Sequence, residues 1–270
     1  MPRRLDGLAG QVLQFEMIPL LHWEIQSERG GALEATVAGT LRARELRGRL
    51  REHVRLYVLT DRGVARGRSQ GEVVRQAIWG GATMVQLRGK QLTTLQLLEA
   101  AREVRRVTGE AGVPFIVNDR VDIALAAEAD GVHVGHIGQE DLPPDVARRL
   151  LGPARLVGVS VATPEEARLA EQLGADYVSV GPVYETAVKL DAGPSVGLER
   201  VRAVRAATRL PLVAIGGITA ATAGEVIRAG ADGIAVISAV VAAEDISAAA
   251  RQLRAAIEAA LQERRGEGMS

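Results

Sequence analysis

Short runs of apolar residues recur along the chain from residue 56 onward, and polar turns separate them. Four of these runs follow a similar turn of small residues, which ends at Thr83, Asp130, Asp176 and Asp232. Successive turns lie about twice as far apart as one strand–helix unit requires, since a whole βαβ motif takes roughly 30 residues. A further apolar run is therefore expected between each pair of turns.

The expected runs are present. Three of them closely follow a proline, and another opens the series. Together with the four runs after the turns, they predict eight strands, at residues 56–60, 84–86, 115–117, 131–134, 156–159, 177–180, 212–215 and 233–237. Unbroken aliphatic runs of this kind are typical of parallel strands that are buried on both faces.

The segments between the runs have the features of helices. Thr163 and Pro164 suit the N-cap and the first position of a helix, and two glutamates follow in its first turn. Residues 95–107 and 224–229 carry apolar residues at three- and four-residue spacing. Alternating strands and helices in this number predict an α/β fold, the (β/α)8 TIM barrel. A doubly wound open sheet is the alternative, but its G-x-G-x-x-G fingerprint is absent after the first strand.

These patterns divide the chain into three parts. Residues 1–54 form an N-terminal extension, partly helical, whose role the sequence leaves open. Residues 55–264 form the barrel and catalytic domain, and residues 265–270 form a C-terminal tail. Within the extension, residues 41–54 have a basic amphipathic pattern, LRARELRGRLREHV. This pattern predicts a solvated helix packed beside the barrel, with a membrane-surface or partner helix as the alternative.

The composition narrows the class of protein. Basic and acidic side chains balance at 33 each, which argues against a nucleic-acid-binding protein. The chain has no cysteine, so it has no disulfide, thiolate nucleophile or sulfur-ligated metal. No apolar run approaches the roughly 18 residues of a membrane span, and polar residues interrupt the start of the chain where a signal peptide would lie. We expect a cytoplasmic protein without a membrane partner.

Polar residues follow the predicted strands at the end where TIM barrels hold their active sites. The pair Gly216-Gly217 follows the seventh strand, and Ser238 follows the eighth. Glycine lets backbone N–H groups approach an anion, and a helix N-terminus adds a favourable dipole. These residues therefore predict a phosphate site, with a simple tight turn as the alternative.

A second polar group follows the second, third and fourth strands. It combines two cations, Arg88 and Lys90, with two carboxylates, Asp119 and Asp141. Carboxylates oppose phosphate binding unless a cation joins them, and Mg2+ is commonly held by one or two carboxylates together with phosphate oxygens. The group therefore predicts a diphosphate site with Mg2+, and a metal-free network of ion pairs is the alternative. Two neutral hydrogen-bonding residues complete it: Gln86 and Asn118.

Eight stretches between residue 56 and the C-terminal helix resemble the thiamine phosphate synthase family. They are YVLTD, GGATMVQLRGK, GVPFIVNDR, ADGVHVG with GQEDLP, VGVS, GADYVSVGPVYETAVK, LVAIGGI and GADGIAVISA, in the family's order. The resemblance implies a transferase that joins 4-amino-2-methyl-5-hydroxymethylpyrimidine diphosphate to a thiazole phosphate or carboxyphosphate. The products would be thiamine phosphate and pyrophosphate, so the expected partners are two small phosphorylated substrates.

The resemblance also implies roles for individual residues. The pyrimidine diphosphate would be held by Gln86, Arg88, Lys90, Asn118, Ser160 and Lys189. The thiazole phosphate would lie against Thr186, Ala187, Val188, Gly217, Ile237 and Ser238. The ligands of Mg2+ would be Asp119 and Asp141. The reaction would be dissociative, with the departing pyrophosphate stabilised by Arg88, Lys90 and Lys189.

The chain departs from the family's pattern at three places. Gly89 stands where the family usually has an acid, and Val188 stands where a threonine is common. The VGHIGQED segment after the fourth strand is three residues longer than the usual turn, so the role of Asp141 depends on that loop folding back. Otherwise His136 or Glu140 would occupy the space.

Three other functions share some of these features. The sister thiazole tautomerase relies on a histidine soon after the fifth strand, where this chain has Ser160 and no histidine within the next three residues. A phosphosugar isomerase or epimerase needs an acid–base pair on opposing strands, whereas His133 is expected to be a packed interior side chain. A non-catalytic phosphometabolite-binding regulator would not need the charged rim residues. The sequence leaves the oligomeric state open.

Overall fold

The structure is a computed structural model that describes residues 38–138, 142–186 and 194–267. The chain divides into two compact units, Met1–Ala38 and Gly39–Ser270. The second unit holds all the elements below.

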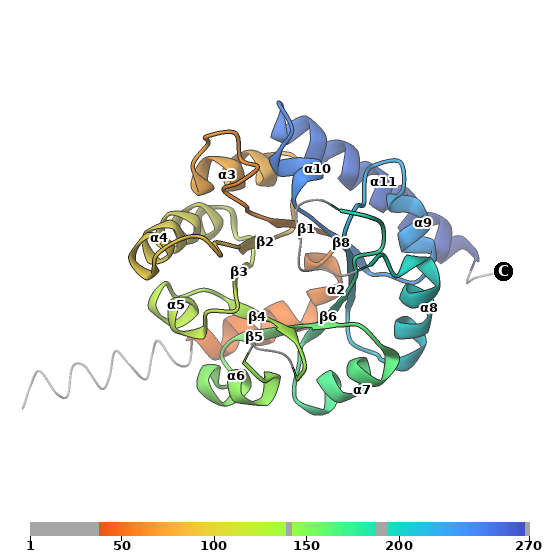
Figure 1. The fold of residues 1–270 in the computed structure, drawn as a ribbon, viewed down its shortest axis with the longest axis horizontal. Coiled ribbons are helices and arrows are strands. Elements are labelled where there is room, and N and C mark those ends of the chain that lie inside the picture. Colours follow the sequence, from red (N-terminus) through yellow and green to blue (C-terminus); the bar gives the residue numbers. More distant parts are fainter. Residues whose placement is uncertain (1–37, 139–141, 187–193, 268–270) are drawn as a thin grey trace, which may run out of the picture. The chain divides into compact units, whose positions relative to one another are not determined.

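Eight parallel strands form a closed barrel in which each strand pairs with the next and the last pairs with the first (Figure 1). The strands are β1 (Leu56–Leu59), β2 (Met84–Leu87), β3 (Phe115–Asn118), β4 (Gly131–His136), β5 (Leu156–Val161), β6 (Tyr177–Val180), β7 (Leu212–Ile215) and β8 (Gly233–Val236). The predicted (β/α)8 barrel is confirmed, and each strand lies where the apolar runs placed it.

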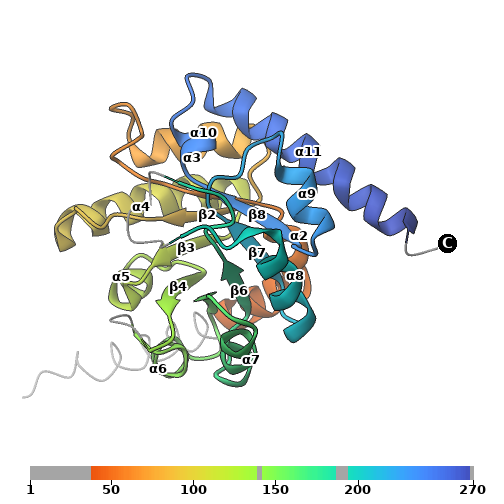
Figure 2. The same cartoon turned by 45° about the vertical axis from the view of Figure 1, so that its right-hand side comes forward.

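Helices surround the strands. They are α3 (Gln70–Trp79), α4 (Thr94–Ala111), α5 (Val121–Ala126), α6 (Pro144–Leu151), α7 (Pro164–Gln172), α8 (Gly197–Ala207), α9 (Ala223–Arg228), α10 (Ser238–Val241) and α11 (Ile246–Glu267). The long helix α11 packs against both α3 and α9 and so closes the ring of helices (Figure 2).

Local sequence signals set where several helices begin. The side chain of Ser69 caps α3 and that of Thr163 caps α7, in each case by accepting a bond from a backbone N–H of the first turn. At α4, Thr93 and Gln96 form a reciprocal capping box, and Gly112 ends the helix in the left-handed conformation.

Two apolar layers hold the barrel together. Alternate residues of each strand face outward to the helices or inward to the barrel axis, so that Leu56 and Val58 join the outer layer and Tyr57 and Leu59 the inner one. The inner layer also includes Leu46 from the helical residues 39–48 and one residue from each of six other strands: Met84, Ile116, Leu156, Tyr177, Val213 and Ala235.

The N-terminal helical segment contributes directly to the inner layer. Residues 39–48 and α2 (Leu50–His53) are helical, and Leu46, Leu50 and Val54 are at most 3% exposed. These side chains belong to the same cluster as the inward-facing residues of the strands. Burying each one contributes about 1.5–3 kcal/mol to folding. A helix was correctly expected within residues 41–54, but its place beside the barrel was wrong, because its apolar side chains close the barrel from below as a floor.

The repeated small-residue turns have a structural role beneath the barrel. The carboxylates of Asp130 and Asp232 accept bonds from the first backbone N–H groups of β3 and β7, and that of Asp176 accepts a bond from the second N–H of β5, that of Val157. Each carboxylate also pairs with one arginine of the floor segment and with an arginine of an outer helix, and Asp232 pairs in addition with Arg264 of α11. The floor arginines are Arg42, Arg47 and Arg51, and the outer ones are Arg105, Arg148 and Arg205. The three aspartates therefore join the floor to three strand starts.

No helix in the described part of the chain is long and apolar enough to cross a membrane.

Candidate active site

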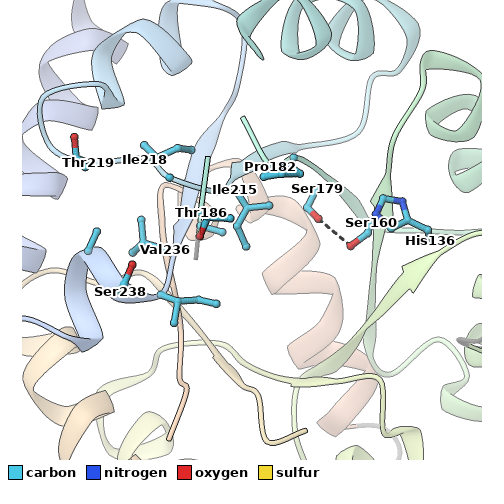
Figure 3. A pocket seen from close by; sticks show the side chains of 16 residues that line it. His136, Ser160, Ser179, Pro182, Thr186, Ile215, Ile218, Thr219, Val236 and Ser238 are labelled. Atoms are coloured by element: carbon cyan, nitrogen blue, oxygen red, sulfur yellow. Dashed lines mark hydrogen bonds between the residues drawn. The ribbon is translucent and has the colours of Figure 1, made fainter. Parts of the chain in front are cut away.

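A pocket of about 240 Å3 opens among the carboxyl ends of β5, β6, β7 and β8 (Figure 3). Its wall includes Pro182 and Ile215, with Ile218 and Thr219 from the segment after β7. Five residues predicted from the sequence also line it: Ser160, Thr186, Gly217, Ile237 and Ser238. The carboxyl ends of these strands thus bring together residues that lie far apart in the chain.

Backbone conformation forms one wall of this pocket. Gly216 and Gly217 have φ values of 101° and 64°, a region that side chains disfavour. A Cβ on Gly217 would also lie only 2.7 Å from Cβ of Tyr184. Ser238 begins the short helix α10 directly after β8. The glycine pair and the start of α10 both line the pocket, as a phosphate cradle requires.

The second group of predicted residues follows β2 and β3. Arg88 is largely buried, with 11% of its side chain exposed, and it forms an ion pair with Asp61. Asp61 directly follows the YVLT run at the end of β1. Asp61 was not among the predicted site residues, although it lies within the YVLTD motif. Lys90, by contrast, is exposed.

Asp119 is held at the end of β3 in an unusual conformation. Its φ is 60°, in the left-handed region, and its N–H donates to the carbonyl of His133 at 2.8 Å. The amide Nδ2 of Asn118 donates to Oδ2 of Asp119 at 2.5 Å. The neighbouring amide and backbone therefore fix the direction of this carboxylate. The predicted residues Asp141, Ala187, Val188 and Lys189 lie outside the described residues.

A line of hydrogen bonds crosses the barrel interior below the pocket. Nε2 of Gln86 donates to the Tyr57 hydroxyl at 2.7 Å, and that hydroxyl lies 2.9 Å from the Tyr177 hydroxyl. The Tyr177 hydroxyl lies 3.1 Å from Nδ1 of His133, and Nε2 of His133 lies 3.1 Å from Oγ of Ser160. His133 is thus an interior side chain, as expected, and it is also hydrogen-bonded through both ring nitrogens.

Burial sets the charge of the two phenols in this line. Because Tyr57 and Tyr177 are at most 1% exposed, desolvation raises the pKa of each hydroxyl above its ordinary value. Both phenols are therefore neutral at neutral pH, and each carries a single proton.

A histidine from the longer β4 turn also reaches the pocket. His136 lines it, and a break in strand register after Val134 sets His136 opposite Ser160 of β5. Its Nδ1 lies 3.7 Å from Oε2 of Glu166, which in turn accepts a bond from the backbone N–H of Ala162. The sequence analysis named His136 only as a substitute for Asp141.

Comparison with known proteins identifies the family. The family model described as thiamine monophosphate synthase matches residues 56–240, which is most of the barrel. The chain belongs to the thiamine monophosphate synthase family.

Relatives within the thiamine monophosphate synthase family agree with this assignment. The thiamine-phosphate synthase of Chloroflexus aurantiacus is 57% identical over 203 residues, covering 75% of this chain and 92% of the relative. That of Moorella thermoacetica is 55% identical, covering 74% and 93%. A solved structure of thiamine phosphate pyrophosphorylase from Pyrococcus furiosus is 44% identical, with a TM-score of 0.72, and covers 78% of this chain and 99% of that one.

Membership of the thiamine monophosphate synthase family confirms the function predicted from the sequence, a transferase of thiamine biosynthesis.

Proposed function

We propose that the mouth of this barrel joins an aminopyrimidine diphosphate to a thiazole phosphate and releases pyrophosphate. The observation that carries the proposal is the presence of two distinct polar regions at one end of the barrel. One is the glycine-lined pocket over β5 to β8, and the other is the charged group after β2 and β3. Two phosphorylated substrates require two such regions, whereas a single phosphate ligand requires one.

The diphosphate is assigned to the group after β2 and β3. Arg88 presents a guanidinium that is already fixed by Asp61, so little side-chain freedom is lost when an anion binds. Lys90 and Lys189 add positive charge. Together these groups stabilise negative charge that grows on the leaving pyrophosphate.

Mg2+ fits the donors at the end of β3. The Asp119 carboxylate and the neighbouring Asn118 amide supply hard oxygen atoms, which Mg2+ prefers. The described residues contain no group of three or more carboxylate or histidine side chains that could form a complete protein cage. A site with few protein ligands suits an ion that is shared with substrate phosphates. Asp119 and Asp141 would hold Mg2+, and charge on the departing pyrophosphate would be neutralised by it when bound.

The thiazole phosphate is assigned to the pocket over β5 to β8. Its phosphate would be bound by Gly217, Ile237 and Ser238, with Thr186 at the border of the ring. The thiazole nitrogen would then face the pyrimidine methylene across the mouth. Once the carbon–oxygen bond to pyrophosphate breaks, the electron-rich aminopyrimidine supports the cationic methylene, and the nitrogen captures it. Holding both substrates in this arrangement supplies much of the acceleration.

A Gly217→Ala variant is expected to weaken binding of the thiazole phosphate. The new methyl group would meet Tyr184, and alanine disfavours the φ of 64° by about 1–2 kcal/mol. We expect the KM for the thiazole phosphate to rise about tenfold, with the KM for the pyrimidine diphosphate changed less than about twofold. Steady-state kinetics with each substrate varied in turn measures both values.

Gly112→Ala is the matched control. Gly112 has a φ of 69°, open space around its Cα and a position at the end of α4. It carries the same backbone penalty, so both KM values should stay unchanged. A Gly217→Ala enzyme with an unchanged KM for the thiazole phosphate would contradict the placement of that substrate.

The reaction itself is tested by incubating the full chain with both phosphorylated substrates, with and without Mg2+, and detecting thiamine phosphate and pyrophosphate. Stoichiometric formation of both products only with Mg2+ is expected. A tautomerase would instead convert the thiazole phosphate without the pyrimidine, and a regulator would bind without turnover. Either result would refute the proposed reaction. A cytoplasmic location is part of the proposal, because phosphorylated substrates do not cross membranes unaided.

A further inference from the structure

The hydrogen bonds inside the barrel connect two residues to which the family resemblance gives contacts with the pyrimidine diphosphate. Gln86 stands at one end of the line and Ser160 at the other, with Tyr57, Tyr177 and His133 between them. All five side chains are at most 8% exposed. Neutral side chains are therefore sufficient to connect Gln86 with Ser160.

The protons in this line have a definite direction. Nε2 of Gln86 donates to the Tyr57 oxygen. A neutral phenol has only one proton, and a buried proton without an acceptor is costly. For each proton in the line to have an acceptor, Tyr57 must donate to Tyr177, and Tyr177 must donate to Nδ1 of His133. Nδ1 is then an acceptor, which places the proton of a neutral imidazole on Nε2. Nε2 donates that proton to the oxygen of Ser160 at 3.1 Å, while Oγ of Ser179 lies slightly farther from it, at 3.3 Å.

The two ends of the line offer a ligand opposite hydrogen-bonding groups: Gln86 offers an acceptor and Ser160 offers a donor. Oε1 of Gln86 is buried and has no hydrogen-bond partner among the described residues. A buried acceptor without a donor is costly, so a ligand donor that bonded to this atom would relieve that cost. Ser160 lines the pocket and already accepts the bond from His133, so its own hydroxyl proton remains available to an acceptor. Ser179, 3.4 Å from Ser160, is the competing protein acceptor.

We propose that Tyr57, Tyr177 and His133 form a positioning relay that makes Gln86 an acceptor and Ser160 a donor toward the substrate. The proposal rests on the proposed function, in which the substrate carries an amino group on a pyrimidine and a diphosphate. An amino group donates to Oε1 of Gln86, and a diphosphate oxygen accepts from Ser160. The relay therefore selects an aminopyrimidine over an oxopyrimidine, whose carbonyl would face the Gln86 carbonyl.

Reversing the polarity of either end would require every member of the line to reverse. If Gln86 presented its NH2 group to the ligand, Tyr57 would have to donate to Gln86 and accept from Tyr177. His133 would then carry its proton on Nδ1, and Ser160 would donate to His133. Because each phenol and the neutral imidazole carry one proton, the orientation of the Gln86 amide determines the direction in which the Ser160 hydroxyl donates.

A glycine makes room for the centre of the relay. A Cβ at Gly158 on β5 would overlap the Tyr177 hydroxyl and Nδ1 of His133. Any other residue at position 158 would separate these two groups, so the backbone of β5 is itself adapted to their contact.

The tautomer of His133 is the direct test. Nitrogen-15 NMR of the ligand-free full chain should show Nδ1 of His133 unprotonated and Nε2 protonated, and a His133→Gln variant identifies the signal among the four histidines of the chain. Tyr177→Phe removes the donor to Nδ1, so the preference for this tautomer should be lost. A wild-type imidazole protonated on Nδ1, or an unaltered tautomer in Tyr177→Phe, would overturn the relay.

Kinetics with Tyr57→Phe tests the selectivity. We expect the ratio of kcat/KM for the aminopyrimidine over the corresponding oxopyrimidine diphosphate to fall at least about tenfold, with the KM for the thiazole phosphate changed less than about twofold. Thr108→Val is the control, because it removes another buried hydroxyl, bonded to Val104 in α4, and should leave the ratio unchanged. An unchanged ratio in Tyr57→Phe would refute the relay.

The two experiments separate this proposal from the proposed function. If the wild-type chain made no thiamine phosphate, the function would fail while the tautomer measurement remained valid. If it made thiamine phosphate but His133 had the other tautomer, only the relay would fail.

Discussion

Replacing Asp119 with asparagine is expected to reduce the Mg2+-dependent formation of thiamine phosphate at least about 100-fold, because a metal-bound carboxylate supports several kcal/mol of charge stabilisation. The substitution removes the negative charge and leaves the side chain's size unchanged. Steady-state turnover across a Mg2+ titration measures the effect, and we expect both a lower kcat and a weaker apparent affinity for Mg2+.

Asparagine is the informative replacement because of the backbone at this position. The φ of 60° at Asp119 is one that asparagine tolerates and alanine disfavours. Asp119→Asn therefore isolates the charge, whereas Asp119→Ala would add backbone strain to the lost ligand. The melting temperature of Asp119→Asn should match that of the wild type. Wild-type turnover at low Mg2+ in this variant would contradict the metal site.

Replacing Asp176 with alanine should strongly destabilise the fold from beneath the barrel. Its carboxylate, 10% exposed, pairs with Arg47 and Arg148 and accepts the Val157 N–H. Removing it leaves two arginines and a strand amide without their partner. Breaking a buried ion pair of this kind costs about 3–5 kcal/mol. Urea unfolding monitored by circular dichroism measures the loss.

Glu199→Ala is the control for Asp176→Ala. Glu199 forms an ion pair with Arg202 on α8, but 89% of its side chain is exposed. Exposed pairs of this type contribute about 0.2–1 kcal/mol, so the free energy of unfolding should change little. If Asp176→Ala and Glu199→Ala destabilised the chain equally, the floor contacts would not have the importance assigned to them.

The sequence predicted the barrel because its strands carry a strong local signal. Each strand is buried on both faces and therefore appears as a continuous aliphatic run, which needs no knowledge of its partners. The turn ending in Asp176 was visible as one of a repeated set, but its role was not. Its partner Arg47 lies 129 residues away, and only the folded chain shows that they meet.

Site residues could be predicted from the sequence where they directly follow a strand, because TIM barrels hold their active sites at the carboxyl ends of the strands. Ser160, Thr186, Gly217 and Ser238 were expected at the mouth, and the structure gathers them around one pocket. Asp61 was missed because its importance lies in its contact with Arg88, which the sequence does not reveal.

The barrel interior shows a different limit of sequence reasoning. His133 was correctly expected to lie inside the barrel, but a single polar residue in an apolar strand does not reveal its neighbours. Its bonds to Tyr177 and Ser160 depend on the register between three strands. The sequence did contain one signal of these hydrogen bonds, because tyrosine, glutamine, histidine and serine occupy inward positions of separate strands.

The floor helix has a consequence for anyone who shortens this gene. A recombinant fragment starting at Leu56 would retain every strand but lose Leu46, Leu50 and Val54, and water would reach the underside of the inner layer. The aspartates at the strand starts would at the same time lose Arg42, Arg47 and Arg51. A stable enzyme therefore needs a chain that begins before Arg42, well upstream of the first strand.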